Sequence, residues 1–154
     1  MNLCSTFEST NISMKKTAMI TSPRYILLDD DIFALAIATN VVRNHSRRAE
    51  VVGFSRCKEA IKYIEADYTK RKYPDTVFLT DLHMPEMDGF ALLDRMENSL
   101  KAIRGQFHIF VLSAAACPDE IRRVLSYRCV TGFFQKPFSF DKMDQLVSRI
   151  QHPH

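Results

Sequence analysis

Residues 25–31 read Tyr-Ile-Leu-Leu-Asp-Asp-Asp, so that four apolar residues in a row end abruptly at three acids. A continuous apolar run of this length is typical of a strand that is buried on both faces of a sheet. The stretch from Ile32 to about Asn44 then carries apolar residues at helical spacing and predicts a helix. A buried strand followed at once by a helix indicates an α/β protein with parallel strands.

The same order of strand and helix recurs four more times along the chain. Further strands are predicted over residues 50–54, 76–80, 108–112 and 132–134. Further helices are predicted from a cap at Ser55 to about residue 70, over 90–100 and 119–127, and from Ser139 or Asp141 to about residue 150. Five such alternations predict right-handed crossovers and a parallel sheet with helices on both faces. Ligands of such sheets bind at the carboxyl ends of the strands, so the residues that follow each strand are the candidates for a site.

The composition is that of one ordinary globular domain. The chain has 154 residues, of which 46% are hydrophobic and 25% are charged. A formal net charge of +3 is too balanced to indicate a nucleic-acid or anionic-membrane partner, and the apolar runs are too short for a membrane-spanning helix. The four cysteines have no C-x-x-C spacing and are typical of reduced thiols, so we expect a cytoplasmic protein.

Residues 1–23 are expected to form a flexible extension, and residues 24–152 the folded domain. The basic Met14-Lys15-Lys16 is followed by an apolar stretch shorter than the roughly 7–15 residues of a secretory signal. We expect no DNA-binding domain, because the last helix uses most of the residues that follow Lys136. The sequence also lacks the glycine-rich loop of a nucleotide-binding site.

Acidic, hydroxyl and amino side chains follow four of the predicted strands. In chain order they are Asp29, Asp30 and Asp31, then Asp81, Ser113 and Lys136. Carboxylates that lie close together repel each other, and a hard divalent cation such as Mg²⁺ removes this repulsion. A carboxylate can also attack phosphorus, while a metal, a lysine and a hydroxyl share the charge of the transferred phosphoryl group. The set therefore predicts phosphoryl transfer onto an aspartate.

Over residues 24–150 the sequence resembles the receiver domain of bacterial response regulators, in particular the stand-alone, chemotaxis-regulator-like type. The matching segments are Ile26–Asp31, Phe78–Gly89, Val111–Ala114 and Phe133–Phe138. The resemblance implies a flavodoxin-like, doubly wound sheet with the strand order 2-1-3-4-5.

The resemblance also implies a role for each site residue. Asp81 would be the phosphoacceptor, and Phe133 the switch aromatic. Mg²⁺ or Mn²⁺ would be held by Asp29, Asp30, Asp81 and the backbone carbonyl of His83. The phosphoryl group would contact Ser113, Lys136 and Ala114, and the Lys136–Pro137 peptide bond would be cis.

The function implied by this resemblance is that of a signalling phosphoacceptor rather than an enzyme. A histidine kinase or a histidine phosphotransfer protein would donate a phosphoryl group to Asp81, and the domain would later lose it to water by self-catalysis. The added charge would draw in Ser113, turn Phe133 inward and change the surface of the fourth helix, fifth strand and fifth helix. Output would be through contact with an unknown downstream protein or through a phosphorelay, as a monomer or a weak phosphorylation-dependent dimer.

Two alternatives remain open at this point. The first is a receiver-shaped interaction module that works without phosphorylation. The second is a phosphatase of the haloacid dehalogenase type with Asp29 as its nucleophile, because Asp29-x-Asp31 after an apolar strand has the spacing of that family's first motif. The aspartate that becomes phosphorylated, Asp29 or Asp81, distinguishes the phosphatase from the receiver.

Overall fold

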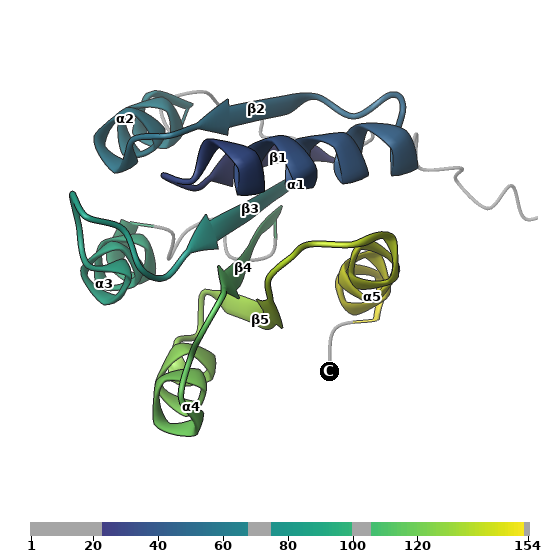
Figure 1. The fold of residues 1–154 in the computed structure, drawn as a ribbon. Helices are drawn as coiled ribbons and strands as arrows, with labels where there is room; N and C mark the ends of the chain where they lie inside the picture. The colour runs from purple at the N-terminus through teal and green to yellow at the C-terminus, as the bar shows by residue number, and fades with distance from the viewer. Residues whose placement is uncertain (1–22, 68–74, 100–105, 153–154) are drawn as a thin grey trace, which may run out of the picture.

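A five-stranded parallel sheet forms the centre of the protein (Figure 1), in a computed structural model that describes residues 23–67, 75–99 and 106–152. The strands lie in the order β2-β1-β3-β4-β5, and each is followed by a helix. The elements are β1 (Arg24–Leu28), α1 (Ile32–His45), β2 (Val51–Phe54), α2 (Cys57–Asp67), β3 (Thr76–Asp81), α3 (Gly89–Ser99), β4 (Phe107–Ser113), α4 (Pro118–Ser126), β5 (Val130–Gln135) and α5 (Phe140–Gln151). The predicted fold class and strand order are confirmed.

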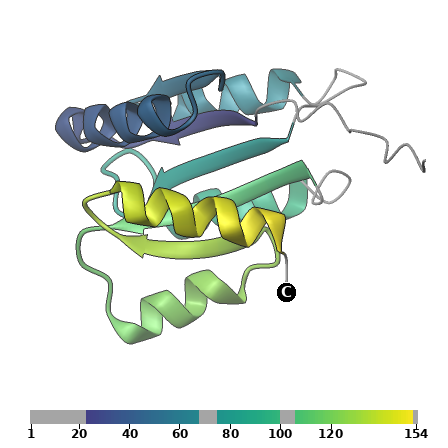
Figure 2. The same ribbon diagram turned by 90° about the vertical axis from the view of Figure 1, so that its right-hand side faces the viewer.

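The helices form one layer on each face of the sheet. Figure 2 shows α1 and α5 in front of the sheet, and the remaining three helices cover its other face. Alternate residues of β1 divide between the two faces: Tyr25 and Leu27 pack with residues of α1 and α5, whereas Ile26 and Leu28 pack with residues of α2, α3 and α4. All five residues of β1 are buried, as a central strand with helices on both faces requires.

Strand register brings the predicted site residues to one edge of the sheet. Leu28 pairs with Thr80, so the next residues along these strands, Asp29 and Asp81, are neighbours. Ser113 at the end of β4 pairs with Gln135 at the end of β5. The order of the strands reverses between β1 and β3, and this is the switch point at which ligands bind in such sheets.

Side chains cap the starts of α1 and α5. Asp31 accepts hydrogen bonds from the backbone amides of Phe33 and Ala34 at the start of α1, and Ser139 accepts one from Lys142 at the start of α5. The expectation that the second helix follows directly after Ser55 was wrong, because α2 begins at Cys57 and its first turn closes on the carbonyl of Arg56. The rigid strand ends and the capped helices hold the loops between them in place.

Two sequence expectations concern residues that lie mostly or partly outside the described ranges. The proposed extension over residues 1–23 lies, except for Pro23, outside the described residues, as does the end of the helix expected to reach residue 70. None of the helices in the described ranges combines the length and apolar character needed to cross a bilayer.

The loop between β3 and α3 closes tightly at Gly89. The backbone amide of Gly89 donates a hydrogen bond to the carbonyl oxygen of Leu82 at 3.1 Å. A Cβ atom at this position would clash with that oxygen and lie 2.8 Å from the Cα of Leu82. Both obstacles are backbone atoms, so they cannot move aside as a flexible side chain can. Gly89 therefore fixes the loop that directly follows Asp81.

We expect Gly89→Ala to lower the free energy of unfolding by about 1–3 kcal/mol, because the added methyl group overpacks a site bounded by backbone. Urea denaturation followed by circular dichroism measures the change. Gly53→Ala is the matched control, since a Cβ atom there meets the Leu35 side chain at an ordinary 3.5 Å. Equal effects of the two substitutions would contradict the close approach at Gly89.

Candidate functional site

Three carboxylates meet at the carboxyl edge of the sheet. Asp29 follows β1, Asp30 is next to it, and Asp81 is the last residue of β3. Oxygen atoms of the three side chains all lie within 4.8 Å of one another, with Asp29 and Asp81 buried and Asp30 exposed. This arrangement places two buried negative charges and one accessible negative charge at a single point on the surface.

The side chain of Lys136 lies between the two buried carboxylates. Its Nζ atom is 2.6 Å from Oδ2 of Asp29 and 2.9 Å from Oδ2 of Asp81. The backbone amide of Lys136 donates a hydrogen bond to the carbonyl oxygen of Ser113 at 2.9 Å. The pairing of β4 with β5 therefore fixes the backbone position from which the lysine side chain extends. The Lys136–Pro137 peptide bond is cis. One ammonium group thus connects the ends of β1, β3 and β5.

Burial and ion pairing compete at this site. Burial raises the pKa of Asp29, and this effect exceeds the opposing hydrogen bonds from Lys136 and from the amide of Asp31. Burial lowers the pKa of Lys136, but its hydrogen bonds to Asp29 and Asp81 outweigh burial and raise that pKa overall. The raised pKa of Asp29 means that its negative charge is incompletely stabilised, so an additional cation near it would be favourable.

The donor set fits a hard divalent cation. Three carboxylates face a single ammonium group, which leaves an excess of negative charge at a partly accessible point. Mg²⁺ binds carboxylate oxygens and retains several waters, and Mn²⁺ accepts the same ligand types. The backbone amide of His83 donates a hydrogen bond to Oδ1 of Asp81 at 3.2 Å, so the loop after β3 turns back toward this carboxylate. The His83 carbonyl as a further metal ligand stays a prediction.

The hydroxyl of Ser113 contacts His83. Ser113 is fully buried at the end of β4, and its Oγ atom lies 3.3 Å from Nδ1 of the His83 ring. The next residue, Ala114, is exposed and lines the same pocket as Lys136. The resemblance implies that Ser113 contacts a phosphoryl group on Asp81, and in the structure the same hydroxyl contacts the His83 imidazole.

Sequence reasoning did not find Glu120, which the structure adds to this group. Oε1 of Glu120 lies 3.2 Å from Nε2 of His83, and Oε2 accepts a hydrogen bond from the backbone amide of Cys117 at 3.0 Å. The amide of Cys117 and then the hydrogen bond from His83 hold the pKa of Glu120 below its usual value. A signal was available, because a glutamate three residues after the residue that precedes a helix is the spacing of a capping box.

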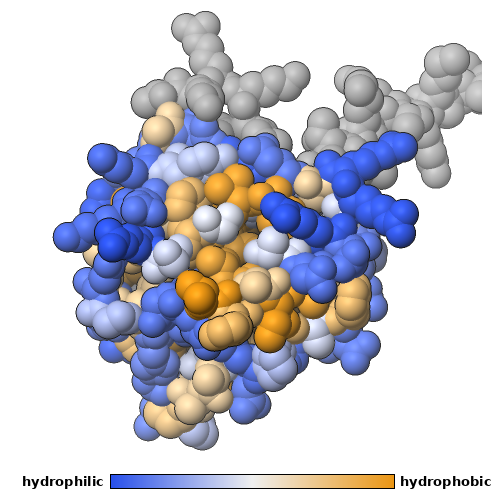
Figure 3. All heavy atoms as spheres, turned by 45° about the horizontal axis from the view of Figure 1, so that its top comes forward, coloured by the Kyte–Doolittle hydropathy of each residue, from blue (hydrophilic) through white to orange (hydrophobic). Residues whose placement is uncertain are grey.

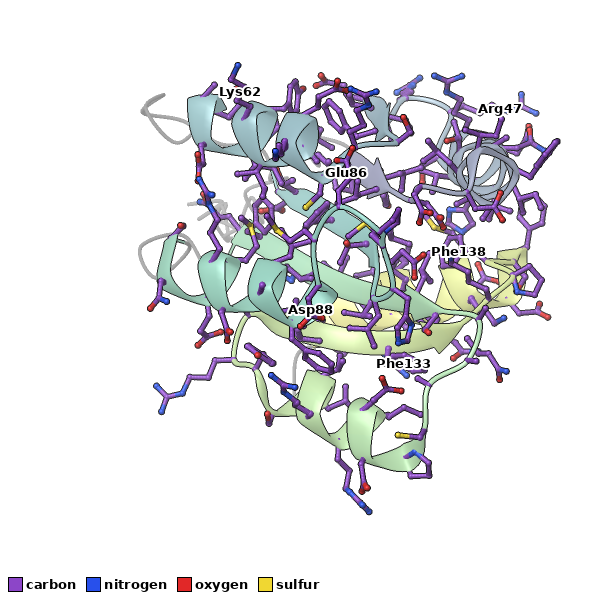
Figure 4. The ribbon with its side chains drawn as sticks, turned by 60° about the vertical axis from the view of Figure 1, so that its left-hand side comes forward. Arg47, Lys62, Glu86, Asp88, Phe133 and Phe138 are labelled. Carbon is purple, nitrogen blue, oxygen red and sulfur yellow. The ribbon has the colours of Figure 1, made fainter. Side chains whose placement is uncertain are left out.

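Phe133 lies on the α4 side of β5 (Figure 4). It is half-buried and packs against the core cluster that includes Val124 of α4. Phe138, in the loop between β5 and α5, is buried in the opposite core cluster, where its ring meets Phe134 edge-on at 6.0 Å between centroids. The expected switch aromatic therefore adjoins the core and α4, and Phe138 serves the core.

A pocket of about 360 Å³ opens beside the carboxylates. Its polar wall includes Asp29 and Lys136, and its apolar wall includes Phe33 and Ile37 of α1. Phe33 is 75% exposed and its neighbour Ile32 is 63% exposed. Figure 3, which brings α1 and β2 toward the viewer, shows hydrophobic residues gathered within a hydrophilic border. The site thus has an exposed apolar rim on one side.

Comparison with known proteins agrees with the class that the fold and site define, a doubly wound α/β protein with an acidic site at its switch point. The model of the response regulator receiver domain family matches residues 26–149. The chain belongs to the response regulator receiver domain family.

Relatives with curated names come from both bacteria and plants. Sporulation initiation phosphotransferase F of Bacillus subtilis is 28% identical over 124 residues, which are 80% of this chain and 90% of that protein. The two-component response regulator ORR3 of Oryza sativa subsp. indica is 26% identical over 135 residues, 88% of this chain and 95% of that protein. A two-component response regulator from Cytophaga hutchinsonii has the same fold, with a TM-score of 0.75, 19% identity and coverage of 84% of this chain and 96% of that chain.

We expect Lys136→Met to destabilise the metal-free protein by about 3 kcal/mol, because it leaves two buried carboxylates without their cation. Mg²⁺ should then raise the melting temperature of the variant more than that of the wild type, since the metal no longer competes with the ammonium group. Thermal denaturation with and without Mg²⁺ measures both effects.

The control for this experiment is Lys58→Met, which removes an exposed lysine on α2. It should leave both the stability and the Mg²⁺ response close to those of the wild type. Equal Mg²⁺-induced shifts in the Lys136 variant and the wild type would contradict competition between lysine and metal for the same carboxylates.

Proposed function

We propose that this protein is a response regulator, with residues 24–152 as its receiver domain, and that Asp81 accepts a phosphoryl group from a phosphohistidine. The donor is a histidine kinase or a histidine phosphotransfer protein. The observation that carries the proposal is the buried carboxylate of Asp81 beside Asp29 and Asp30, with its Oδ2 atom 2.9 Å from the Lys136 ammonium group. A nucleophile, two further acids and a cation are the groups that phosphoryl transfer onto aspartate needs.

The chemistry is a displacement at phosphorus. A carboxylate oxygen of Asp81 forms the new bond to phosphorus, the bond to the donor's imidazole nitrogen breaks, and its electron pair stays on that nitrogen. Lys136 is placed to exchange one carboxylate contact for a phosphoryl oxygen and to stabilise its charge. When bound at Asp29, Asp30 and Asp81, Mg²⁺ would supply further charge stabilisation to the phosphoryl oxygens. Attack by water on the same phosphorus later restores the free carboxylate.

The phosphorylated aspartate would act as a switch. Its added negative charge attracts the Ser113 hydroxyl, and Phe133 then occupies space nearer the core beside α4. These movements change the conformation of the surface formed by α4, β5 and α5, to which a downstream protein would bind. Signalling would follow from protein contact, from onward transfer of the phosphoryl group in a phosphorelay, or from a weak phosphorylation-dependent dimer.

The apolar rim of the pocket supports docking of a protein donor. Ile32, Phe33 and Ile37 on α1 are exposed hydrophobic side chains, and two of them line the pocket that also holds Asp29 and Lys136. Exposed apolar groups rimmed by polar residues are a common feature of protein-binding surfaces. A donor protein seated on this rim would bring its phosphohistidine directly over the carboxylates.

The alternatives have less support. In a phosphatase of the haloacid dehalogenase type, Asp29 would be the nucleophile and Asp31 its partner. In the structure, Asp31 instead caps α1 by accepting hydrogen bonds from two backbone amides, and Asp29 forms an ion pair with Lys136. A module that is never phosphorylated would have no use for the combined set of acids and lysine at the strand ends.

Incubation with acetyl phosphate and Mg²⁺ should add the mass of one phosphoryl group to the wild type and none to Asp81→Asn, because an amide is not a nucleophile toward phosphorus. Intact-protein mass spectrometry at neutral pH measures the adduct. Asp88→Asn is the matched control, since Asp88 is an exposed acid in the adjoining loop and should leave the adduct unchanged. An undiminished adduct in the Asp81 variant would refute the assignment.

A further inference from the structure

We propose that the His83 side chain is a positioning residue that couples the hydroxyl of Ser113 to α4 through Glu120, and that phosphorylation of Asp81 breaks this link and releases the first turn of α4. The inference rests on the proposed function, because it describes how that same site would be regulated. It goes further in naming a hydrogen-bonded connection, separate from Phe133, between the phosphorylation site and the helix.

Both ring nitrogens of His83 are engaged at once. Nδ1 faces Oγ of Ser113 at 3.3 Å, and Nε2 faces Oε1 of Glu120 at 3.2 Å. A carboxylate only accepts hydrogen bonds, so Nε2 is the nitrogen that carries hydrogen in the neutral ring. Nδ1 is then the acceptor, and the Ser113 hydroxyl donates to it. Before phosphorylation, the hydroxyl hydrogen that Ser113 would donate to a phosphoryl oxygen is therefore donated to Nδ1 of His83.

Glu120 transmits the position of the imidazole to α4. While Oε1 faces His83, Oε2 of the same carboxylate accepts from the backbone amide of Cys117, the residue that caps the helix. A shift of this carboxylate changes a contact with the backbone where α4 begins. One side chain thus joins the loop that follows Asp81 to the first turn of α4.

The rest of α4 is attached in a way that permits movement of its first turn. Val124 is the one residue of α4 that is buried. Next to Val124, the guanidinium of Arg123 lies 3.7 Å from the ring centroid of Phe90, and just after the helix Tyr127 donates from its hydroxyl to Asp94 at 2.8 Å. These contacts hold the carboxyl-terminal half of the helix against α3. These contacts do not reach the amino-terminal half of the helix, so the contact between His83 and Glu120 affects how firmly that half is held.

Phosphorylation would exchange the partner of Ser113. A phosphoryl oxygen carries negative charge and accepts a stronger hydrogen bond than a neutral imidazole nitrogen does. Once the Ser113 hydroxyl turns to this oxygen, Nδ1 of His83 loses its donor and the ring is no longer held in one orientation. The bond from Nε2 to Glu120 is then weakened, and the first turn of α4 opens more often.

The expected size of the effect is modest. The His83 side chain is 54% exposed and that of Glu120 is 32% exposed. Exposed pairs of this kind change an equilibrium by about two- to fivefold at most. We therefore expect amide hydrogen exchange in the first turn of α4 to rise about two- to fivefold on phosphorylation of the wild type.

The test is hydrogen exchange followed by mass spectrometry of peptides that cover residues 117–124, with and without acetyl phosphate and Mg²⁺. His83→Phe keeps an aromatic ring but neither nitrogen, and Glu120→Gln keeps the shape of the side chain but cannot accept from both partners. Each should raise exchange before phosphorylation, and phosphorylation should then add little. Asp141→Asn, a change of an exposed acid in the first turn of α5, should leave the exchange of these peptides as it is in the wild type.

The outcomes separate this inference from the proposed function. The intact mass of each sample reports phosphorylation independently of exchange. Exchange that matches the wild type in both variants before phosphorylation, or that rises by the wild-type factor afterwards, would overturn the coupling while leaving phosphorylation of Asp81 in place. Absence of a phosphoryl adduct on the wild type would overturn the proposed function, and with it the release step.

Discussion

The ammonium group of Lys136 lies between the buried carboxylates of Asp29 and Asp81 and so joins the ends of three strands. Two desolvated negative charges at this distance would repel each other and raise the free energy of the folded state without a cation between them. Lys136 reaches this point because its backbone amide is bound to Ser113 at the end of β4. The site therefore requires the whole parallel sheet, since no local segment brings these residues together.

This constraint divides the domain into a fixed part and a responsive part. Asp29, Asp30 and Asp81 stand at the ends of β1 and β3, which are buried strands with a paired neighbour on each side, and Lys136 is fixed to the end of β4 through its backbone amide. In contrast, α4 has one buried residue and is held at its two ends by polar and cation–π contacts. A local change of charge can move such a helix without disturbing the strands, which suits a domain that must fold stably and yet signal.

Much of the fold could be predicted from the sequence because its determinants are local. Apolar runs such as residues 25–28 mark the buried strands, and the rule that parallel strands end at one edge brings Asp29, Asp81 and Lys136 together. The contacts of Glu120 were missed because they depend on where α4 sits relative to the loop after β3.

The exposed residues of α1 show a second limit. A helix rich in apolar residues indicates burial, and the sequence alone does not say that Ile32 and Phe33 face outward; packing of the neighbouring elements decides that.

The proposed function depends above all on which carboxylate carries the phosphoryl group. Reduction of the phosphorylated wild type with borohydride converts an aspartyl phosphate to homoserine, which peptide sequencing by mass spectrometry locates. Homoserine at position 81, with positions 29 and 30 unchanged, is the predicted result; homoserine at position 29 would contradict it.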